Sequence, residues 1–457
     1  MAGLAQEEGS SSVSSSPLQF FSLMSLSPGI GSPYTFFREM KSDERGMWLF
    51  NLLTICAKWV AVGSLENASM GLEQISLLAS PEGDIVQRIV AYFTEALADR
   101  VLKCWRPGLH KALNSTKTVS ASEMILAQKL FFEFCPFLRL SYVITNQAIL
   151  EAMEGEKVVH IIDLHSFEPA QWINLLQEFK FRKEGPPHLR ITGIHDQKEV
   201  LDQMAVRLNE AAEKLDIPFQ FNPVVSRLEN LDIGSLPVKT GEAVAVSSVL
   251  QLHSMLAFDD ENSRRNSPLP MPMIPRTLGD FLDSPDSTTS SSALSLSQAP
   301  KSLSFLNGLW GLSPKLMVVT EQESNHNGNS LIERVNEALK FYAALFDCLE
   351  NTVPRSPGER QKIEKMLFGE EIKNIIACEG VERKSRHEKL EKWIPRLELA
   401  GFGRVHLSYN GMRQARRVLQ SCNYDGFEIK DENGSFIICW HDDPLFSVSA
   451  WRFKRFY

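Results

Sequence analysis

The sequence predicts an α/β fold: a Rossmann-like, methyltransferase-like and mostly parallel sheet flanked by helices, with an N-terminal helical cap. First, in residues 157–179 the short run VVHIID precedes an amphipathic helical pattern. Such a β-branched run is typical of a strand buried on both faces of a parallel sheet. Second, this strand-helix step recurs along the chain. Third, short alternating runs near the C-terminus are typical of antiparallel strands, which would complete the sheet.

Residues 41–155 are predicted to form the cap, which contains only helices. Apolar residues recur at helical spacing in two stripes that end before Gly63 and Ser80, and Asp84 with Gln87 has the pattern of a capping box ahead of a third helix. We expect most of these stripes to form a core. The alternative is that one leucine-rich face is left to bind a helix of a partner.

Residues 156–457 are predicted to form the Rossmann-like core. The five strands expected first lie at 158–163, 189–194, 218–225, 243–253 and 315–322, and three short strands follow after residue 423. The Pro/Ser/Thr-rich stretch at about 259–304 is predicted to be a disordered insertion, and the Ser-rich residues 1–40 a disordered tail. The composition of the tail does not offset the entropy of ordering it, and a long stretch of this composition inside a domain is typical of an insertion. For the tail, a plain linker is favoured over the alternative, a short docking segment formed by Leu18, Phe20 and Phe21.

Composition and charge argue against several classes of function. The net charge is −8, so the chain as a whole lacks the positive potential that attracts nucleic acid or an anionic membrane. The seven cysteines include no C-x-x-C pair, which argues against a structural zinc site and a disulfide framework. No apolar run reaches membrane-spanning length, so no association with a membrane is expected.

The carboxyl end of the first strand is the place where a fold of this class binds its cofactor. Asp163 ends that strand, and Asp196 follows the second. Phosphate-binding turns need glycines that let backbone amides approach the ligand, but residues 164–168, LHSFE, contain none. We therefore expect no cofactor, and we expect Asp163 to cap the turn or helix that follows. S-adenosylmethionine or another nucleotide is the alternative.

Metal binding and catalysis are weakly supported. His160, Asp163 and His165 are residue types that ligate metals, but alternation along a strand places His160 opposite the other two. We expect His160 to be a partly buried histidine bonded to a neighbour. The chain has no Gly-x-Ser-x-Gly elbow for a nucleophile, and no basic stripe, zinc finger or recognition helix for reading DNA. No catalytic residue and no metal ligand is predicted.

Several long motifs, in the correct order, resemble those of the plant GRAS transcriptional regulators. LLTICAKWVAVGSLENA resembles the family's first leucine-rich region, VVHIID with the following QW pair resembles its central motif, and VLQLHSML lies in its second leucine-rich region. VVTEQESNHNG resembles its Phe-Tyr-Arg-Glu segment, and SAWR resembles its closing region. The sequence departs from the family where Pro169-Ala170 replaces a common glycine and where Glu370 replaces an arginine.

The resemblance implies a non-enzymatic nuclear regulator of transcription, a coregulator or scaffold in gibberellin signalling and root development. It would bind zinc-finger transcription factors and other GRAS proteins, including DELLA repressors, and would contact DNA only indirectly. A methyltransferase-like enzyme and a direct sequence-specific DNA binder are the alternatives. For the two closing-region tryptophans and the arginine beside them, packing is favoured over binding. The candidate partner-binding or motif residues are His160, Asp163, Gln171, Trp172, Leu250, Leu252, Trp440, Trp451 and Arg452.

Overall fold

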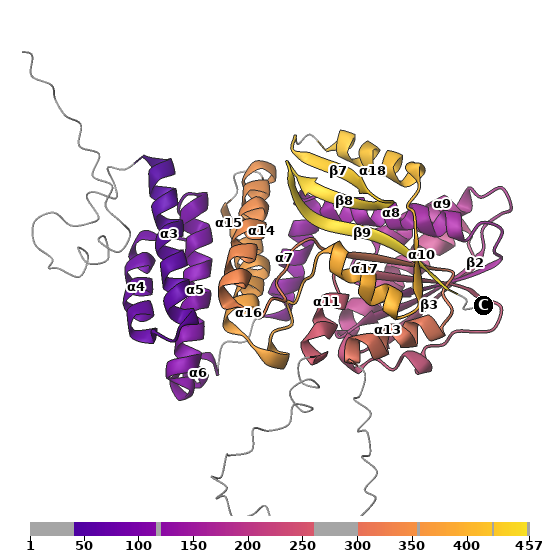
Figure 1. The fold of residues 1–457 in the computed structure, drawn as a ribbon. Coiled ribbons are helices and arrows are strands. Elements are labelled where there is room, and N and C mark those ends of the chain that lie inside the picture. The colour runs from indigo at the N-terminus through magenta and orange to yellow at the C-terminus, as the bar shows by residue number, and fades with distance from the viewer. Residues whose placement is uncertain (1–40, 116–119, 260–299, 354–356, 423–424, 455–457) are drawn as a thin grey trace, which may run out of the picture. The chain divides into compact units, whose positions relative to one another are not determined.

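The computed structural model describes residues 41–115, 120–259, 300–353, 357–422 and 425–454, which form two compact units (Figure 1). The first unit comprises Met1–Phe131 and Gly328–Ala377, and the second comprises Phe132–Asn327 and Cys378–Tyr457. The predicted tail at 1–40 and most of the predicted insertion lie outside the described residues. The predicted insertion, which ended at about residue 304, is slightly too long, because a helix begins at Lys301.

The first unit is helical in its described residues. Its α5 begins with the expected capping box, in which Gln87 N donates to Asp84 Oδ1 at 2.9 Å and Asp84 N donates to Gln87 Oε1 at 3.1 Å. The elements are α3 (Ser42–Ala61), α4 (Leu65–Leu78), α5 (Ile85–Trp105), α6 (Pro107–Asn114), α7 (Ala121–Phe134, up to Phe131), α14 (Leu331–Thr352), α15 (Pro357–Ile363), the π-helix η4 (Glu364–Gly369) and α16 (Glu370–Ala377).

Tertiary packing assembles the first unit from two distant parts of the chain. The edge of Phe93 in α5 contacts Tyr342 in α14, with ring centroids 6.5 Å apart. Both side chains are fully buried. The predicted division of the chain at residue 155 therefore differs from the observed units: residues 328–377 join the N-terminal helices, and residues 132–155 join the sheet.

The second unit contains the sheet, whose strand order is β3-β2-β1-β4-β5-β9-β8-β7, with β6 paired to β9. The first five strands are parallel, and β9 runs antiparallel to β5. This confirms the predicted fold class. The strands are β1 (Val158–Asp163), β2 (His188–His195), β3 (Phe219–Val225), β4 (Ala243–Val249), β5 (Leu316–Gln322), β6 (Phe402–Val405), β7 (Phe427–Glu432), β8 (Ser435–Trp440) and β9 (Asp443–Phe453).

Helices connect these strands because their apolar stripes pack on the sheet. Trp172, Leu175 and Phe179 are the buried stripe of the helix after β1. The strand predicted at 243–253 was too long: β4 ends at Val249, and a helix starts at Leu252. The helices of this unit are α8 (Phe137–Ala152), α9 (Ala170–Lys180), α10 (Lys198–Leu215), α11 (Leu252–Met255), α13 (Lys301–Gly311), α17 (Leu390–Leu399) and α18 (Tyr409–Ser421).

Candidate functional site

Asp163 ends β1 at the edge of the sheet where a cofactor would bind, and its carboxylate is fully engaged by the protein. Oδ1 accepts from the backbone N–H of His165 at 3.2 Å, and Oδ2 accepts from Ser166 Oγ at 2.7 Å and from Trp172 Nε1 at 2.8 Å. Burial raises the pKa of Asp163, and these three hydrogen bonds oppose the shift. The predicted capping role of Asp163 is confirmed, with the α9 indole as an additional donor.

The backbone of the turn after β1 is also committed to the protein. Leu164 N donates to Ser247 O of β4 at 3.0 Å, and Ser166 N donates to Ile194 O of β2 at 2.9 Å. Together with the amide of His165, three successive N–H groups are therefore occupied. Ser166 Oγ also fills the space beside Gly193, where an added Cβ atom would collide with it. This turn does not fit a phosphate or a carboxylate of a cofactor, because both need such amides as donors.

Neutral imidazole rings lie beside this turn. His165 stacks on His195, with ring centroids 5.2 Å apart. Burial is the main cause that lowers the pKa of His165 to about 3, and burial also lowers the pKa of His195. Asp196 follows as a half-exposed residue whose Oδ2 lies 3.5 Å from Arg227 Nε. In a cofactor-binding fold of this class a carboxylate at this position suits the ribose of the ligand, whereas here it faces an arginine on the surface.

His160 lies elsewhere in the sheet and is fully buried. Its Nδ1 is 2.9 Å from Glu242 Oε2, and its Nε2 is 2.8 Å from Thr192 Oγ1. Glu242 is also paired with Arg190. Both ring nitrogens of His160 are thus bonded to side chains, as expected of a structural histidine. Over the described residues, no group of three or more His, Cys, Asp or Glu side chains is arranged to hold a metal.

The QW pair packs the start of α9. Trp172 is 1% exposed and Gln171 is 4% exposed. Asn146 Nδ2 of α8 donates to the backbone carbonyl of Gln171 at 2.7 Å, and the two side-chain amides are bonded at 3.4 Å. These two residues hold α8, α9 and β1 together, so neither side chain is presented to a partner.

The two leucines after β4 lie in a tight turn. Leu250 has a left-handed backbone, with φ 54°, and its N–H donates to Thr320 O at 2.8 Å. Leu252 is buried, and its N–H donates to Glu321 Oε1 of β5 at 2.7 Å. The other oxygen of Glu321 lies 2.9 Å from His253 Nδ1. This turn fixes the carboxyl ends of β4 and β5 relative to each other.

A histidine cluster near the same edge was missed by sequence reasoning. His326 Nδ1 and His387 Nδ1 are 2.9 Å apart, and the His253 and His387 rings have centroids 4.1 Å apart. Arg383 Nη1 also donates to the carbonyl of His326 at 2.9 Å. His326 and His387 are 61 positions apart in the chain, and no local pattern indicates such a contact.

The closing region contains two buried residues and one exposed residue among those predicted. Trp440 is 2% exposed and contacts Phe427, with centroids 4.8 Å apart. Trp451 is fully buried, and its Nε1 donates to Ser449 Oγ at 2.9 Å. The favoured packing interpretation is confirmed for both tryptophans. Arg452 is exposed, so its side chain is open to a partner.

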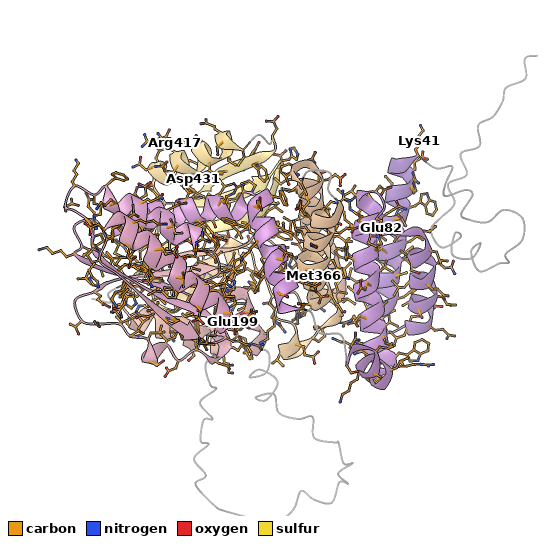
Figure 2. All side chains as sticks on the ribbon, turned by 180° about the vertical axis from the view of Figure 1, so that it is seen from behind. Lys41, Glu82, Glu199, Met366, Arg417 and Asp431 are labelled. Carbon is orange, nitrogen blue, oxygen red and sulfur yellow. The ribbon has the colours of Figure 1, made fainter. Side chains whose placement is uncertain are left out.

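A groove in the first unit lies between α4 and α5. This α4/α5 groove has a volume of about 850 Å³, and Lys365 of η4 also lines it. Trp105 borders it and is 48% exposed. A smaller pocket of about 310 Å³ in the second unit is lined by α8, α9 and α18, and includes Arg417 (Figure 2). Within the described residues, no helix is both long and apolar enough to cross a membrane.

Comparison with known proteins identifies the family. The model of the GRAS domain family matches residues 49–452. The chain is 58% identical to Scarecrow-like protein 3 of Arabidopsis thaliana over the full length of both, and 54% identical to GRAS family protein TF80 of Medicago truncatula over 93% of this chain and 99% of that protein.

More distant relatives agree with this assignment. The chain is 32% identical to DELLA protein GAI1 of Vitis vinifera over 90% of this chain and 62% of that protein. The crystal structure of SCL7 from Oryza sativa matches with a TM-score of 0.69 and 27% identity, over 88% of this chain and 99% of that one. The chain therefore belongs to the GRAS domain family of plant proteins.

Proposed function

We propose that this GRAS protein is a non-enzymatic regulator of transcription that acts in the nucleus by binding other proteins. Its partners would be DNA-bound zinc-finger transcription factors and other GRAS proteins, including DELLA repressors, and its output would affect gibberellin signalling and root development. The α4/α5 groove carries this proposal. It is a hollow of about 850 Å³, and it lies between two helices of the predicted cap.

The chemistry of the α4/α5 groove suits an amphipathic helix or another apolar segment. In a helix-in-groove site, an amphipathic helix lays its apolar face into a hydrophobic groove. Trp105 supplies a large, half-exposed ring of the kind that often dominates the binding energy of an interface. The apolar lining residues are Leu72, Ala79, Pro81, Ala91, Tyr92, Ala98, Val101, Leu102 and Trp105.

The edge of the sheet supports a non-enzymatic role. In cofactor-dependent Rossmann folds the first turn after β1 grips the ligand through free amides. Here the amides of Leu164, His165 and Ser166 already donate to oxygen atoms of the protein. A methyltransferase-like enzyme would need this turn to be rebuilt before it could bind its cofactor.

Retention on promoter DNA tests the proposal. The full-length protein alone should bind DNA weakly, and it should be retained on promoter DNA when a zinc-finger partner is supplied. Ala98→Trp should reduce this retention, because Ala98 is an exposed lining residue and the larger ring would fill the groove. Ala61→Trp is the matched control, since Ala61 is exposed in α3 of the same unit and does not line the groove.

Two results would count against the proposal. Tight, sequence-specific DNA binding by the purified chain, with a steep dependence on salt, would indicate a direct DNA binder. Equal retention of the Ala98→Trp and Ala61→Trp variants would remove the α4/α5 groove from the proposal.

A further inference from the structure

We infer that residues 18–26 of the same chain, LQFFSLMSL, occupy the α4/α5 groove when no partner is bound. The segment would act as a built-in competitor that regulates access to the groove. The regulatory meaning of this contact rests on the proposed function, whereas the docking itself does not.

The α4/α5 groove selects for an uncharged apolar occupant. Its floor is apolar, and the charged residues among its lining are Glu73, Glu95, Arg106 and Lys365, two of each sign. An occupant therefore gains nothing from net charge of either sign. Burial of apolar area, at about 25 cal/mol per Å², is the main driving force available there.

The sequence before the described chain contains such an occupant. Residues 9–37 include no Asp, Glu, Lys or Arg. Within them, 18–26 is a compact block in which six of nine residues are Leu, Phe or Met, and Pro17 and Pro28 flank it. Removing the apolar side chains of this block from water is favourable, so a neutral apolar groove would stabilise the block when it docks there.

The described chain starts close to one end of the groove. The described chain starts at Lys41, next to the first residue of α3 (Figure 2). The start of α3 is close to the start of α5, since a Cβ atom at Gly46 would lie 3.2 Å from Val86. Pro81, at one end of the groove, lies just before α5.

The chain between the block and Lys41 is long enough to reach the whole groove. Residues 27–40 provide 14 connecting residues, which span up to about 50 Å at about 3.5 Å each. The 21 residues of α5 are about 31 Å long at 1.5 Å each. The tether can therefore reach the whole groove, and it holds the block at an effective concentration in the mM range.

Quenching of Trp105 fluorescence in the full-length protein tests the docking without any partner. The signal of Trp105 is the difference between each protein and its Trp105→Phe counterpart. Phe20→Ser/Phe21→Ser should raise the acrylamide quenching constant of Trp105 about two-fold, because a tethered segment at mM effective concentration otherwise covers the ring in most molecules. A synthetic peptide of residues 16–29, added to this variant, should lower the constant again.

The matched control is Phe36→Ser/Phe37→Ser. It makes the same two substitutions in a second Phe-Phe pair, which lies outside the block. It should leave the quenching of Trp105 unchanged. The inference is overturned if the two double variants behave alike. It is also overturned if the protection of Trp105 depends on protein concentration, because a second copy would then supply the occupant. Neither result bears on retention on promoter DNA, so the failure of this inference is distinguishable from failure of the proposed function.

Discussion

The indole Nε1 of Trp172 donates a hydrogen bond of 2.8 Å to Oδ2 of Asp163, across the turn that joins β1 to α9. Both side chains are buried. The acidic residue that ends the first strand is therefore part of a joint between strand and helix. In an enzyme of this fold the same position would face a ligand.

Trp172→Phe tests the strength of this joint. The change keeps an aromatic ring but removes the indole donor, so the buried carboxylate of Asp163 loses one of its three hydrogen bonds. We expect the free energy of unfolding to fall by about 1–3 kcal/mol, the usual cost of leaving a buried polar group short of a partner. Denaturant unfolding followed by circular dichroism measures it. Trp105→Phe, at a half-exposed site, should change stability by about 0.5 kcal/mol or less.

The parts of the fold that were predicted from the sequence depend on local patterns. The β1–α9 step follows from a β-branched run and a helical stripe, and the capping box before α5 follows from Asp84 and Gln87 three positions apart. The period of two along a strand placed His160 away from Asp163. These patterns indicate which face of a helix or strand is buried, but they do not predict which residues from elsewhere in the chain pack against that face.

Long-range contacts account for what was missed or wrong. Glu242 pairs with His160 across 82 positions, and the N-terminal helices receive α14 through contacts such as Phe93 with Tyr342. The strand predicted to reach residue 253 ends earlier because Leu250 takes a left-handed backbone, which an extended strand does not allow. The four-residue β6 is too short to show an alternating pattern.

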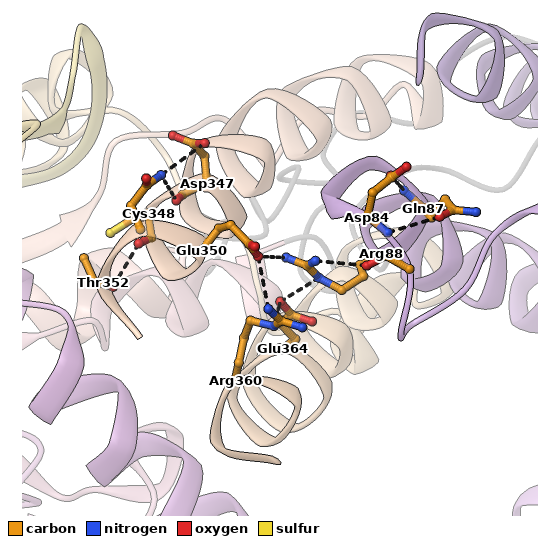
Figure 3. Close-up of polar contacts among 11 residues, drawn as sticks. Asp84, Gln87, Arg88, Asp347, Cys348, Glu350, Thr352, Arg360 and Glu364 are labelled. Atoms are coloured by element: carbon orange, nitrogen blue, oxygen red, sulfur yellow. Dashed lines mark hydrogen bonds and ion pairs between the residues drawn. The ribbon is translucent and has the colours of Figure 1, made fainter. Parts of the chain in front are cut away.

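The buried carboxyl of Glu364 predicts a pH dependence in the first unit. Its Oε1 accepts from Arg88 Nε at 3.1 Å and lies 3.5 Å from Arg360 Nε (Figure 3). Burial raises the pKa of Glu364 from 4.5 to about 7, against the opposing charges of the two arginines. The native state therefore binds this proton more tightly than the unfolded state does. The stability contributed by protonation is present below pH 4.5 and is lost as the pH rises to about 7.

Glu364→Gln should remove this dependence. A shift from 4.5 to about 7 corresponds to about 3 kcal/mol. Compared with the Glu364→Gln variant, the wild-type protein should lose about 3 kcal/mol of its free energy of unfolding as the pH rises from 4.5 to about 7. Urea unfolding at several pH values measures the difference. Glu350→Gln is the control, because Glu350 also bonds Arg88 but is 45% exposed (Figure 3). A Glu364→Gln variant with the native pH slope would contradict the prediction.

The contact between His326 and His387 predicts an energetic coupling. Their Nδ1 atoms, 2.9 Å apart, join the loop after β5 to the segment that precedes α17. In a double-mutant cycle with His326→Phe and His387→Phe, we expect a coupling energy of about 0.5–3 kcal/mol. As a control, His326→Phe should be additive with His188→Phe, since His188 starts β2 at the opposite, amino end of the parallel strands. Strict additivity of the first pair would show that the contact contributes nothing.

The closed turn after β1 predicts that cofactors leave stability unchanged. A functional site would bind S-adenosylmethionine in the native state alone, and ligand at 100 times its dissociation constant would add about 2.7 kcal/mol to the free energy of unfolding. Because Leu164 N and Ser166 N already donate to Ser247 O and Ile194 O, we expect no change in the melting temperature at about 1 mM ligand. Ser166→Gly should behave in the same way, because it widens the space beside Gly193 without freeing an amide. A dose-dependent rise in melting temperature that Asp163→Asn abolishes would place a ligand at this edge and reverse the assignment of a non-enzymatic role.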